Sequence, residues 1–252
     1  MRSSRADLSS DVHFSVVIPA YNEAELLPRL LRSLQVARQG YAGGAERIEL
    51  IVADNASTDA TAALAEQHGC RVARVEKRMI AAARNGGARL ARGDVLCFID
   101  ADMQVHPETF NVIAHALGRG DAIAGATGLT SERWSPGIVF TCAVFLPLVW
   151  LIGMDAGVVF CRRSDFEAIG GYREDRLYAE DVVFLLDLKK HGRKSGRRLV
   201  RPRGARAIAS ARKFDEHGDW HMLFSLGWMC VNQLIAPRQA ERDAQAYWYR
   251  VR

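Results

Sequence analysis

Two aspartates separated by one residue, Asp100 and Asp102, are the pair in this sequence best suited to binding a metal ion. They follow the hydrophobic run Val95–Ile99, so both carboxylates would emerge on the same side of a strand-to-loop turn. Carboxylate oxygens, completed by phosphate oxygens and waters, suit Mg²⁺ or Mn²⁺. The alternative is that the two acids cap the next element or line a solvated loop.

A basic segment provides the opposite charge. Residues 189–213 contain 11 Lys and Arg and no acid, so most of the net charge of +5 lies there. The segment has no aromatic side chain placed between the cations for base stacking, which argues against nucleic acid. Phosphate on a ligand, or an anionic membrane, is the more fitting partner.

The elements that must position these groups alternate between strand and helix. This alternation predicts an α/β domain with a mostly parallel sheet, in which ligands bind at the carboxyl ends of the strands. Strands are predicted at residues 14–19, 48–53, 72–75 and 95–100, and helices at 23–38, 60–68, 79–91 and 179–191.

Acids and amides follow the predicted strands at residues 21–23, 54–55 and 100–102. Neither G-x-G-x-x-G nor G-x-x-x-x-G-K-[ST] occurs in the sequence, which argues against dehydrogenases and P-loop kinases. A sugar-phosphate nucleotidyltransferase would show a glycine-rich, lysine-bearing turn after the first strand, and P-A-Y-N-E at 19–23 is not such a turn.

Four motifs occur in a fixed order: P-A-Y-N-E at 19–23, A-D-N-A-S-T-D at 53–59, an R-N-G-G turn at 84–87 and F-I-D-A-D at 98–102. As a set they resemble the nucleotide-sugar-binding half of the family 2 glycosyltransferases with the GT-A fold. The resemblance is close over residues 14–110 and looser over 153–192. It implies a Rossmann-like, mostly parallel central sheet flanked by helices.

The resemblance assigns donor-binding roles to residues at the predicted strand ends. Tyr21 would stack on the nucleobase, and Glu23 and Asp54 would accept hydrogen bonds from base and ribose. Many family members carry a second acid where this chain has Asn55, which lowers the expectation of a donor contact there. The alternative is that Glu23 starts a helix and Ser57 caps one. The full donor-binding set is Pro19, Ala20, Tyr21, Glu23, Asp54, Ser57, Arg84, Asp100, Ala101 and Arg212.

The resemblance also implies the catalytic groups. Asp100 and Asp102 would hold the metal ion that neutralises the departing diphosphate. The run from Asp100 to Gln104 further resembles polyprenyl-phosphate sugar transferases, in which the position of Gln104 adds an oxygen ligand and the acceptor is a membrane lipid. Y-A-E-D at 178–181 resembles the motif whose aspartate is the general base, so Asp181 would deprotonate the acceptor. The alternative is that these acids favour a helix N-terminus, which suits Glu180 better.

Other charged residues have open roles. Arg162 or Arg163 would bind a phosphate of the donor or the acceptor, or would be surface charges without a function. The segment 210–217 is the expected loop closing over the diphosphate, where Arg212 and Lys213 suit phosphate contacts. His217 or His221 is an alternative metal ligand, although lone histidines are more often structural or solvated.

The 19 residues from Pro136 to Met154 carry no charge. Three interpretations remain open: a buried core segment, an apolar surface that touches a membrane or a lipid acceptor, or a membrane span. Pro147 in the middle argues against spanning. Together with the basic segment, the stretch suggests peripheral attachment to the inner face of the cell membrane.

Composition and cysteine usage fix the general class. The chain is 49% hydrophobic and 25% charged, as expected of a globular protein. Its five scattered cysteines form no C-x-x-C pair, and no secretory signal precedes Val12, so a reducing, cytoplasmic location is expected. We expect one domain over residues 1–252, with a nucleotide-sugar-binding half at about 14–110, an acceptor and catalytic half at about 111–220, and a C-terminal tail at about 221–252.

The sequence therefore predicts an inverting glycosyltransferase that depends on Mn²⁺ or Mg²⁺. The donor would be a UDP- or GDP-sugar, and the acceptor a hydroxyl or phosphate group, which includes a lipid-linked or cell-envelope molecule. The main rival is a protein of the same fold that binds a glycan or lipid without catalysis.

Overall fold

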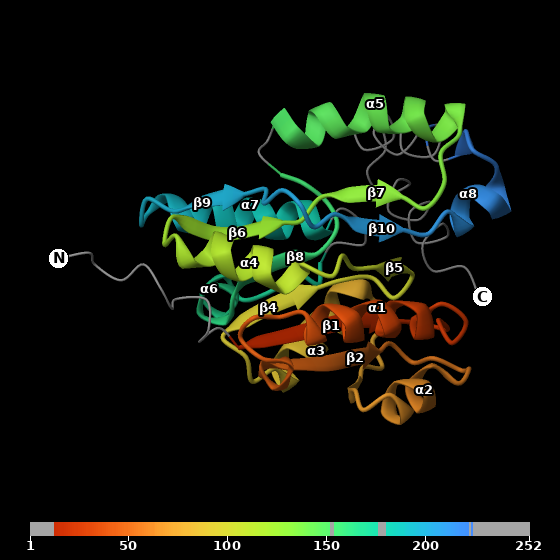
Figure 1. The fold of residues 1–252 in the computed structure, drawn as a ribbon, viewed down its shortest axis with the longest axis horizontal. Helices are drawn as coiled ribbons and strands as arrows, with labels where there is room; N and C mark the ends of the chain where they lie inside the picture. The colour runs from red at the N-terminus through yellow and green to blue at the C-terminus, as the bar shows by residue number, and fades with distance from the viewer. Residues whose placement is uncertain (1–12, 152–153, 176–179, 222, 224–252) are drawn as a thin grey trace.

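Seven strands form one mixed sheet through the middle of the molecule (Figure 1). The structure is a computed structural model that describes residues 13–151, 154–175, 180–221 and 223. From one edge of the sheet to the other, the strands are β3 (Arg71–Arg74), β2 (Ile48–Asp54), β1 (Phe14–Ala20), β4 (Val95–Phe98), β8 (Val159–Arg162), β6 (Ala122–Ala126) and β9 (Arg198–Val200).

The first four strands of this order, β3, β2, β1 and β4, are parallel neighbours. β8 runs antiparallel to both β4 and β6, and β9 is parallel to β6. The carboxyl ends of β1, β2 and β4 therefore meet at the same edge of the sheet, and the polar residues that follow these strands are brought together there. The mostly parallel α/β sheet predicted from the alternation is confirmed.

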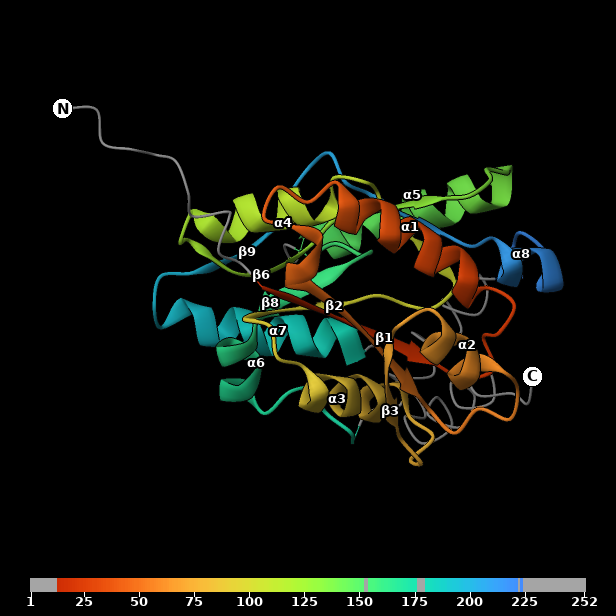
Figure 2. The ribbon, with the colours of Figure 1, turned by 60° about the horizontal axis from the view of Figure 1, so that its bottom comes forward.

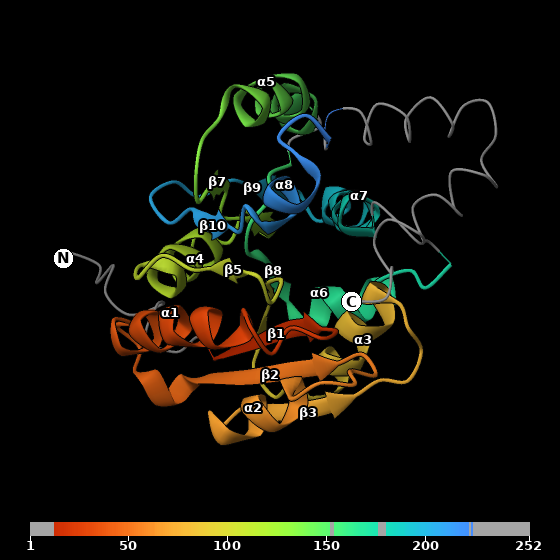
Figure 3. The same ribbon diagram turned by 90° about the vertical axis from the view of Figure 1, so that its right-hand side faces the viewer.

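Helices cover both faces of the sheet (Figures 2 and 3). One face carries α1 and α4, and the other carries α3, α6 and α7. α2 packs beside β2 and β3 at the sheet edge. The helices are α1 (Leu27–Gln39), α2 (Thr61–Gln67), α3 (Ile80–Leu90), α4 (Thr109–Gly118), α5 (Pro136–Leu151), α6 (Arg163–Ile169), α7 (Glu180–Arg193) and α8 (Arg212–His217), with a short 3-10 turn at Ala45–Arg47.

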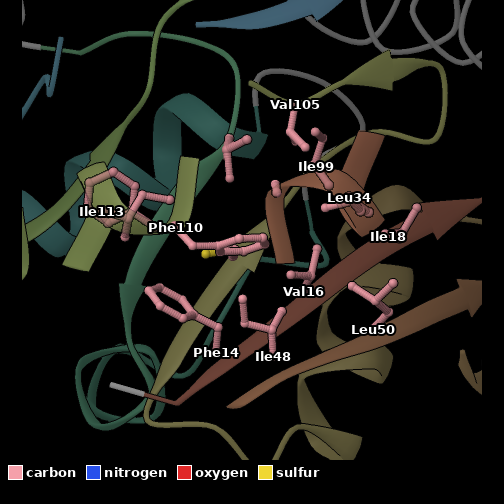
Figure 4. Close-up of a cluster of buried hydrophobic side chains, with 14 of the residues drawn as sticks. Phe14, Val16, Ile18, Leu34, Ile48, Leu50, Ile99, Val105, Phe110 and Ile113 are labelled. Atoms are coloured by element: carbon pink, nitrogen blue, oxygen red, sulfur yellow. The ribbon is translucent and has the colours of Figure 1, made fainter. Parts of the chain in front are cut away.

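An apolar layer fills the space between the sheet and α1 and α4 (Figure 4). Alternate β1 residues Phe14, Val16 and Ile18 contribute to it, together with Leu34 of α1 and Phe110 of α4. Each such side chain contributes about 1.5–3 kcal/mol when fully buried. Because the intervening β1 residue is buried in the layer on the opposite face, β1 is a continuous apolar run rather than an alternating one.

The second apolar layer lies between the sheet and α3, α6 and α7. It contains Val17 of β1, Ile51 of β2 and Phe98 of β4, packed against the alanines of α3 and against Phe184 of α7. Tyr172 closes this layer and stacks on Phe184 with ring centroids 4.0 Å apart. The second layer thus ends at an aromatic cluster directly beneath the start of α7.

A small second sheet connects the two halves of the chain. β10 (Ala207–Ala209) pairs antiparallel with β5 (Met103–Gln104) and parallel with β7 (Leu129–Ser131). This pairing brings the segment after residue 209 next to the segment that follows Asp102. α5 lies beyond β7 and β10, at the top of Figures 1 and 3.

Two predicted elements differ from the structure. The helix predicted over 23–38 begins at Leu27, where Pro28 occupies the first turn, because proline lacks the N–H that a helix interior requires. The R-N-G-G motif at 84–87 lies inside α3 and not in a turn. Its glycines remove the side chains that would meet the sheet, since a Cβ on Gly87 would lie 2.4 Å from Cγ1 of Val17.

The uncharged stretch 136–154 forms α5 over most of its length. Phe140 and Val139 are each 52% exposed, and Trp150 is 44% exposed, whereas Ile138 is buried. An interpretation as core is therefore wrong for the exposed side chains. Among the described residues, no helix combines the length and the apolar content needed to cross a membrane.

The cysteines within the described residues carry free thiols. Cys70, Cys97 and Cys161 are buried, and Cys142 is half-buried. Burial raises the pKa of the Cys70 thiol to about 11, so it stays protonated and behaves as a small apolar side chain. Cys230 lies outside the described residues.

Candidate functional site

A buried arginine joins three carboxylates at the carboxyl end of β4. Arg84, in α3, is only 3% exposed. Its Nη1 donates to Glu180 Oε1 at 2.8 Å and to Asp181 Oδ1 at 2.6 Å, and its Nη2 donates to Asp100 Oδ1 at 2.9 Å. Its guanidinium also lies over the ring of Tyr172, 5.1 Å from the centroid. Residues separated by up to 97 positions thus share one charged cluster.

The two acids at the start of α7 differ in exposure. The Asp181 side chain is 37% exposed, whereas the Glu180 side chain is 12% exposed. Glu180 is thus largely enclosed beside Arg84, while part of the Asp181 side chain is exposed to solvent. Tyr178, which completes the Y-A-E-D motif, lies outside the described residues.

The environment of Asp181 disfavours its charge. Desolvation raises the pKa of its carboxyl to about 7, with repulsion from Glu180 and Asp100 acting in the same direction. Arg84, and to a lesser degree Tyr172, act in the opposite direction. A carboxyl with a pKa near neutrality is well matched to accepting a proton from a substrate hydroxyl.

A second ion pair lies next to Asp102, the other acid of the D-x-D pair. Arg212, at the start of α8, binds Glu23 through two hydrogen bonds of 3.0 Å, Nη1 to Oε2 and Nη2 to Oε1. Its Nη2 also lies 3.6 Å from Asp102 Oδ2. The structure therefore brings together three predicted site residues, Glu23, Asp102 and Arg212, from distant parts of the sequence.

The predicted base-stacking residue contacts an arginine. Arg78 Nη2 donates to the Tyr21 hydroxyl at 2.6 Å, and the Arg78 guanidinium carbon lies 4.6 Å from the centroid of the Tyr21 ring. A planar cation on an aromatic face is a favourable stack. A base that stacked on the same face of Tyr21 would displace Arg78.

The loops after β1 and β2 are tied together by side-chain caps. Asn22 N donates to Ser57 Oγ at 3.0 Å, Glu23 N donates to Thr61 Oγ1 at 2.9 Å, and Ser57 N donates to Asp54 Oδ1 at 3.3 Å. Ser57 thus joins two loops. The predicted residues Pro19 and Ala20 lie at the end of β1, paired in register with Ala53 and Asp54 of β2.

The contacts of Asn55 explain why this chain has an amide where many members of the family have a second acid. Its Nδ2 donates to the carbonyl oxygens of Val75 at 3.0 Å and Lys77 at 2.7 Å, and its Oδ1 accepts from Met79 N at 3.0 Å. A carboxylate at this position could not donate either of the first two bonds. Asn55 therefore holds the loop that carries Arg78 to Tyr21.

Gln104, the predicted third metal ligand, contacts another cation. With its amide oxygen facing Arg29, that oxygen accepts from Nη2 at 2.7 Å and from Nε at 3.2 Å. Arg29 in turn pairs with Glu132. A metal ion at Gln104 would have to displace Arg29. Gln104 as a ligand stays a prediction, whereas Asp100 and Asp102 keep partly exposed side chains, with Ala101 buried between them.

The remaining charged candidates have contacts of their own. Arg162 Nη2 donates to the carbonyl oxygen of Leu117 at the end of α4, at 2.8 Å. His217 and His221 stack on each other with ring centroids 4.7 Å apart. Within the described ranges, no group of three or more His, Cys, Asp or Glu residues is placed to hold a metal ion. The Lys213 side chain lies outside what the structure describes.

Sequence reasoning assigned no role to Arg78, Tyr172 or Asn85. Asn85 Nδ2 donates to the Tyr172 carbonyl oxygen at 2.9 Å, and its Oδ1 accepts from Tyr172 N at 2.9 Å, so it fixes the ring under Arg84. The signal was present, because Arg84 and Asn85 are adjacent polar residues on the alanine-rich inner face of a helix. Nothing in the local sequence pairs Arg78 with Tyr21.

The side chains at this site provide three kinds of chemical group: oxygen ligands for a cation, a proton acceptor and a cation for phosphate. Two partly exposed aspartates, Asp100 and Asp102, provide hard oxygen ligands that fit a divalent cation together with phosphate oxygens. Asp181 provides a proton acceptor, and Arg212 provides a guanidinium suited to phosphate. The chemistry of these groups therefore fits a diphosphate that is bound through a cation and a neighbouring hydroxyl that loses its proton.

Comparison with protein families and curated relatives gives one consistent result. Residues 15–136 match the family model described as glycosyl transferase family 2. A validoxylamine A glucosyltransferase from Streptomyces hygroscopicus subsp. jinggangensis is 40% identical over 40% of this chain and 25% of its own length. An undecaprenyl-phosphate 4-deoxy-4-formamido-L-arabinose transferase from Pseudomonas paraeruginosa is 34% identical over 44% of this chain and 34% of its own length. The chain thus spans only a quarter to a third of these two relatives.

Solved structures match over much more of the chain. Glucosyl-3-phosphoglycerate synthase from Mycobacterium tuberculosis, in complex with Mn²⁺, UDP and glucosyl-3-phosphoglycerate, aligns with a TM-score of 0.59 over 91% of this chain and 81% of that chain. The sequence identity is 19%, so this likeness concerns the fold.

Proposed function

Given that residues 15–136 belong to glycosyl transferase family 2, in a chain with the GT-A fold, we propose that this protein transfers a sugar from a nucleotide diphosphate sugar, with inversion at the anomeric carbon. The observation that carries the proposal is the Arg84 cluster. It links the D-x-D acid Asp100 to the partly exposed acid Asp181, a pairing that a binding protein without catalysis would not need.

The donor would bind at the carboxyl ends of β1, β2 and β4. Its nucleobase and ribose would contact Tyr21, Glu23 and Asp54, with Pro19 and Ala20 lining the site. Arg212 sits between Glu23 and Asp102, and its guanidinium would bind the diphosphate. UDP and GDP donors are both compatible with this set.

The reaction would be a direct displacement. With a hydroxyl acceptor, its oxygen attacks the anomeric carbon and Asp181 takes the hydroxyl proton. The bond from that carbon to the diphosphate oxygen breaks on the opposite face, and its electron pair leaves with the nucleoside diphosphate. Because there is only one displacement and no covalent enzyme intermediate, the configuration at the anomeric carbon is inverted, and a single base is enough.

Asp100 and Asp102 would hold Mn²⁺ or Mg²⁺ together with donor phosphate oxygens. When bound, the cation supplies Lewis-acid stabilisation of the negative charge on the leaving group. Gln104 would join only if its amide leaves Arg29.

The acceptor side supports a lipid-linked substrate. One curated relative is an undecaprenyl-phosphate sugar transferase. In this chain, α5 exposes Val139, Phe140 and Trp150, and Arg201 lies over the Trp150 ring at 5.8 Å. An apolar face edged by a cation suits peripheral contact with an anionic bilayer, where a lipid acceptor would be presented.

Calorimetry with UDP and GDP, each with Mn²⁺ and with EDTA, tests donor binding. We expect one nucleotide to bind with Mn²⁺ and to bind at least 10-fold more weakly in EDTA. Nucleotide release from a panel of UDP- and GDP-sugars then tests turnover. Asp181→Asn should bind nucleotide as the wild type does and lose at least 100-fold in turnover.

Asp187→Asn is the matched control, because Asp187 lies on the same helix and pairs with Arg173 away from the cluster. It should turn over as the wild type does. Wild-type turnover in Asp181→Asn would remove Asp181 as the base. Nucleotide binding without turnover of any donor, even in the wild type, would favour the binding protein of the same fold.

A further inference from the structure

Arg84 is the group that connects the metal-side acid to the base. The R-N-G-G motif suggests a donor contact for this arginine, yet the described N–H contacts of its Nη atoms are made to carboxylates. Nη2 faces Asp100, and Nη1 is shared by Glu180 and Asp181. Both Nη atoms are thus bound to carboxylates, whereas the buried Nε has no hydrogen-bond partner within the part of the chain that the structure describes.

Close packing of α3 and of Tyr172 limits where Arg84 can lie. Gly86 and Gly87, directly after it in α3, bring the helix close enough to the sheet that a Cβ on either would lie 2.4 Å from a valine methyl group. Tyr172 supports the guanidinium from below and is itself held by Asn85. The cation therefore has little freedom to follow a ligand.

The charges around Arg84 explain why such a fixed cation is needed. Three carboxylates surround a single guanidinium, so repulsion between them favours moving the start of α7 away from Asp100. Residues 176–179, just before α7, are not described. α7 begins with Glu180 and Asp181 themselves, so the Arg84 bonds act directly on its first turn.

We propose that Arg84 is a positioning residue, which holds Asp181 at a fixed place relative to Asp100 and does not bind the donor. This inference rests on the proposed glycosyl transfer and adds a residue role to it. Misplacing a base by about 1 Å is enough to cost roughly 100-fold in rate. The loss should appear in kcat, since Asp100 is also placed by the strand β4 that precedes it and the other proposed donor contacts come from other residues.

The experiment compares Arg84→Lys and Arg84→Gln with the wild type. It follows release of UDP or GDP from the nucleotide sugar that the wild type turns over, with Mn²⁺ present. Arg89→Gln is the matched control, because Arg89 lies on the same helix with its side chain exposed. Thermal melting of each variant establishes that it is folded.

We expect KM for the donor to stay within about 3-fold of the wild type in every variant. We expect kcat to fall about 10-fold in Arg84→Lys, because one ammonium keeps the charge but cannot hold three carboxylates in the guanidinium geometry. In Arg84→Gln it should fall about 100-fold or more, and Arg89→Gln should match the wild type.

Two results overturn the assignment. One is a folded Arg84→Lys with wild-type kcat, which decides the matter even if Arg84→Gln does not fold. The other is a rise of 10-fold or more in KM with kcat unchanged, which makes Arg84 a donor ligand. If the wild type itself turns over no donor, the proposed function fails, and this assignment fails with it. If the wild type is active and the Arg84 variants are unaffected, only this assignment fails.

Discussion

At the scale of single residues, two buried amides each hold a loop of the site. Asn55 binds three backbone groups of the segment 75–79, and Asn85 binds both backbone groups of Tyr172. An amide is needed because each side chain must donate and accept at once, which a carboxylate cannot do. Each amide can therefore affect donor binding through the loop it holds, without contacting the donor.

Asn55→Asp should destabilise the protein by about 1–3 kcal/mol, since two buried carbonyl oxygens lose their donor and face a carboxylate oxygen instead. Urea unfolding at pH 7 measures the loss. Gln67→Glu, an exposed amide-to-acid change in α2, should be close to neutral. Equal stability of Asn55→Asp and the wild type would show that the amide does not hold this loop.

Asp181 makes stability depend on pH. Its pKa is raised from an ordinary 3.8 to about 7, so the folded state keeps the proton that the unfolded chain loses. The free energy of unfolding therefore falls as pH rises from about 4 to about 7, and no such penalty exists where both states are protonated. Asp181→Asn lacks this loss.

In EDTA, the melting temperature of Asp181→Asn should exceed that of the wild type by a margin that widens from pH 5 to pH 8. Asp187→Asn, on the same helix, should show no widening margin. A difference that stays constant over this range would contradict the raised pKa.

At the scale of elements, α3 approaches the sheet more closely than a helix with larger side chains would. Alanines and two glycines form its inner face, and Gly87 leaves no room for a Cβ beside Val17 and Ala53. This close approach sets the depth at which Arg84 meets the three carboxylates. The small residues of α3 thus serve the site as well as the core.

Gly87→Ala should cost about 1–3 kcal/mol through overpacking, less whatever alanine gains in helix propensity. Val17→Ala opens space at the same contact. The double variant, measured by urea unfolding, should be less destabilised than the sum of the two single variants. Additive losses would mean that the two positions do not contact each other.

At the scale of the whole molecule, the small sheet is a second connection between the early and late parts of the chain, beside the pairing of β4 with β8 in the seven-stranded sheet. β10 pairs with both β5 and β7, which carries Arg212 to Glu23 and Asp102. α5 lies beyond β7 and β10 (Figure 1), and its side chains Val139, Phe140 and Trp150 are exposed. A lipid acceptor bound along α5 would approach the site from that side.

Flotation with vesicles containing anionic lipid tests this surface. The wild type should bind at low salt and bind less at 0.5 M salt, where charges are screened over roughly 4 Å. Phe140→Ser and Trp150→Ser should each weaken binding several-fold. Val36→Ser, an equally exposed apolar change on α1, should not. Vesicle binding by neither the wild type nor any variant would remove the peripheral contact.

Periodicity and residue type were enough to predict the order of the strands and helices along the first hundred residues, the strand ends that carry polar groups, and the D-x-D and E-D pairs. These are local features, because hydrophobic periodicity and residue type depend on near neighbours. The family resemblance followed from the same local motifs, which is why it is closest over residues 14–110.

Only the tertiary structure decided how those groups meet. Arg84 lies 97 residues before Asp181, and Glu23 lies 189 residues before Arg212, so no local pattern links them. The partners of Asn55, the Arg78 stack on Tyr21 and the exposure of α5 likewise depend on packing between distant segments. Which distant charges pair depends on the low dielectric and the fixed geometry of the folded interior. Neither can be read from the order of the residues along the chain.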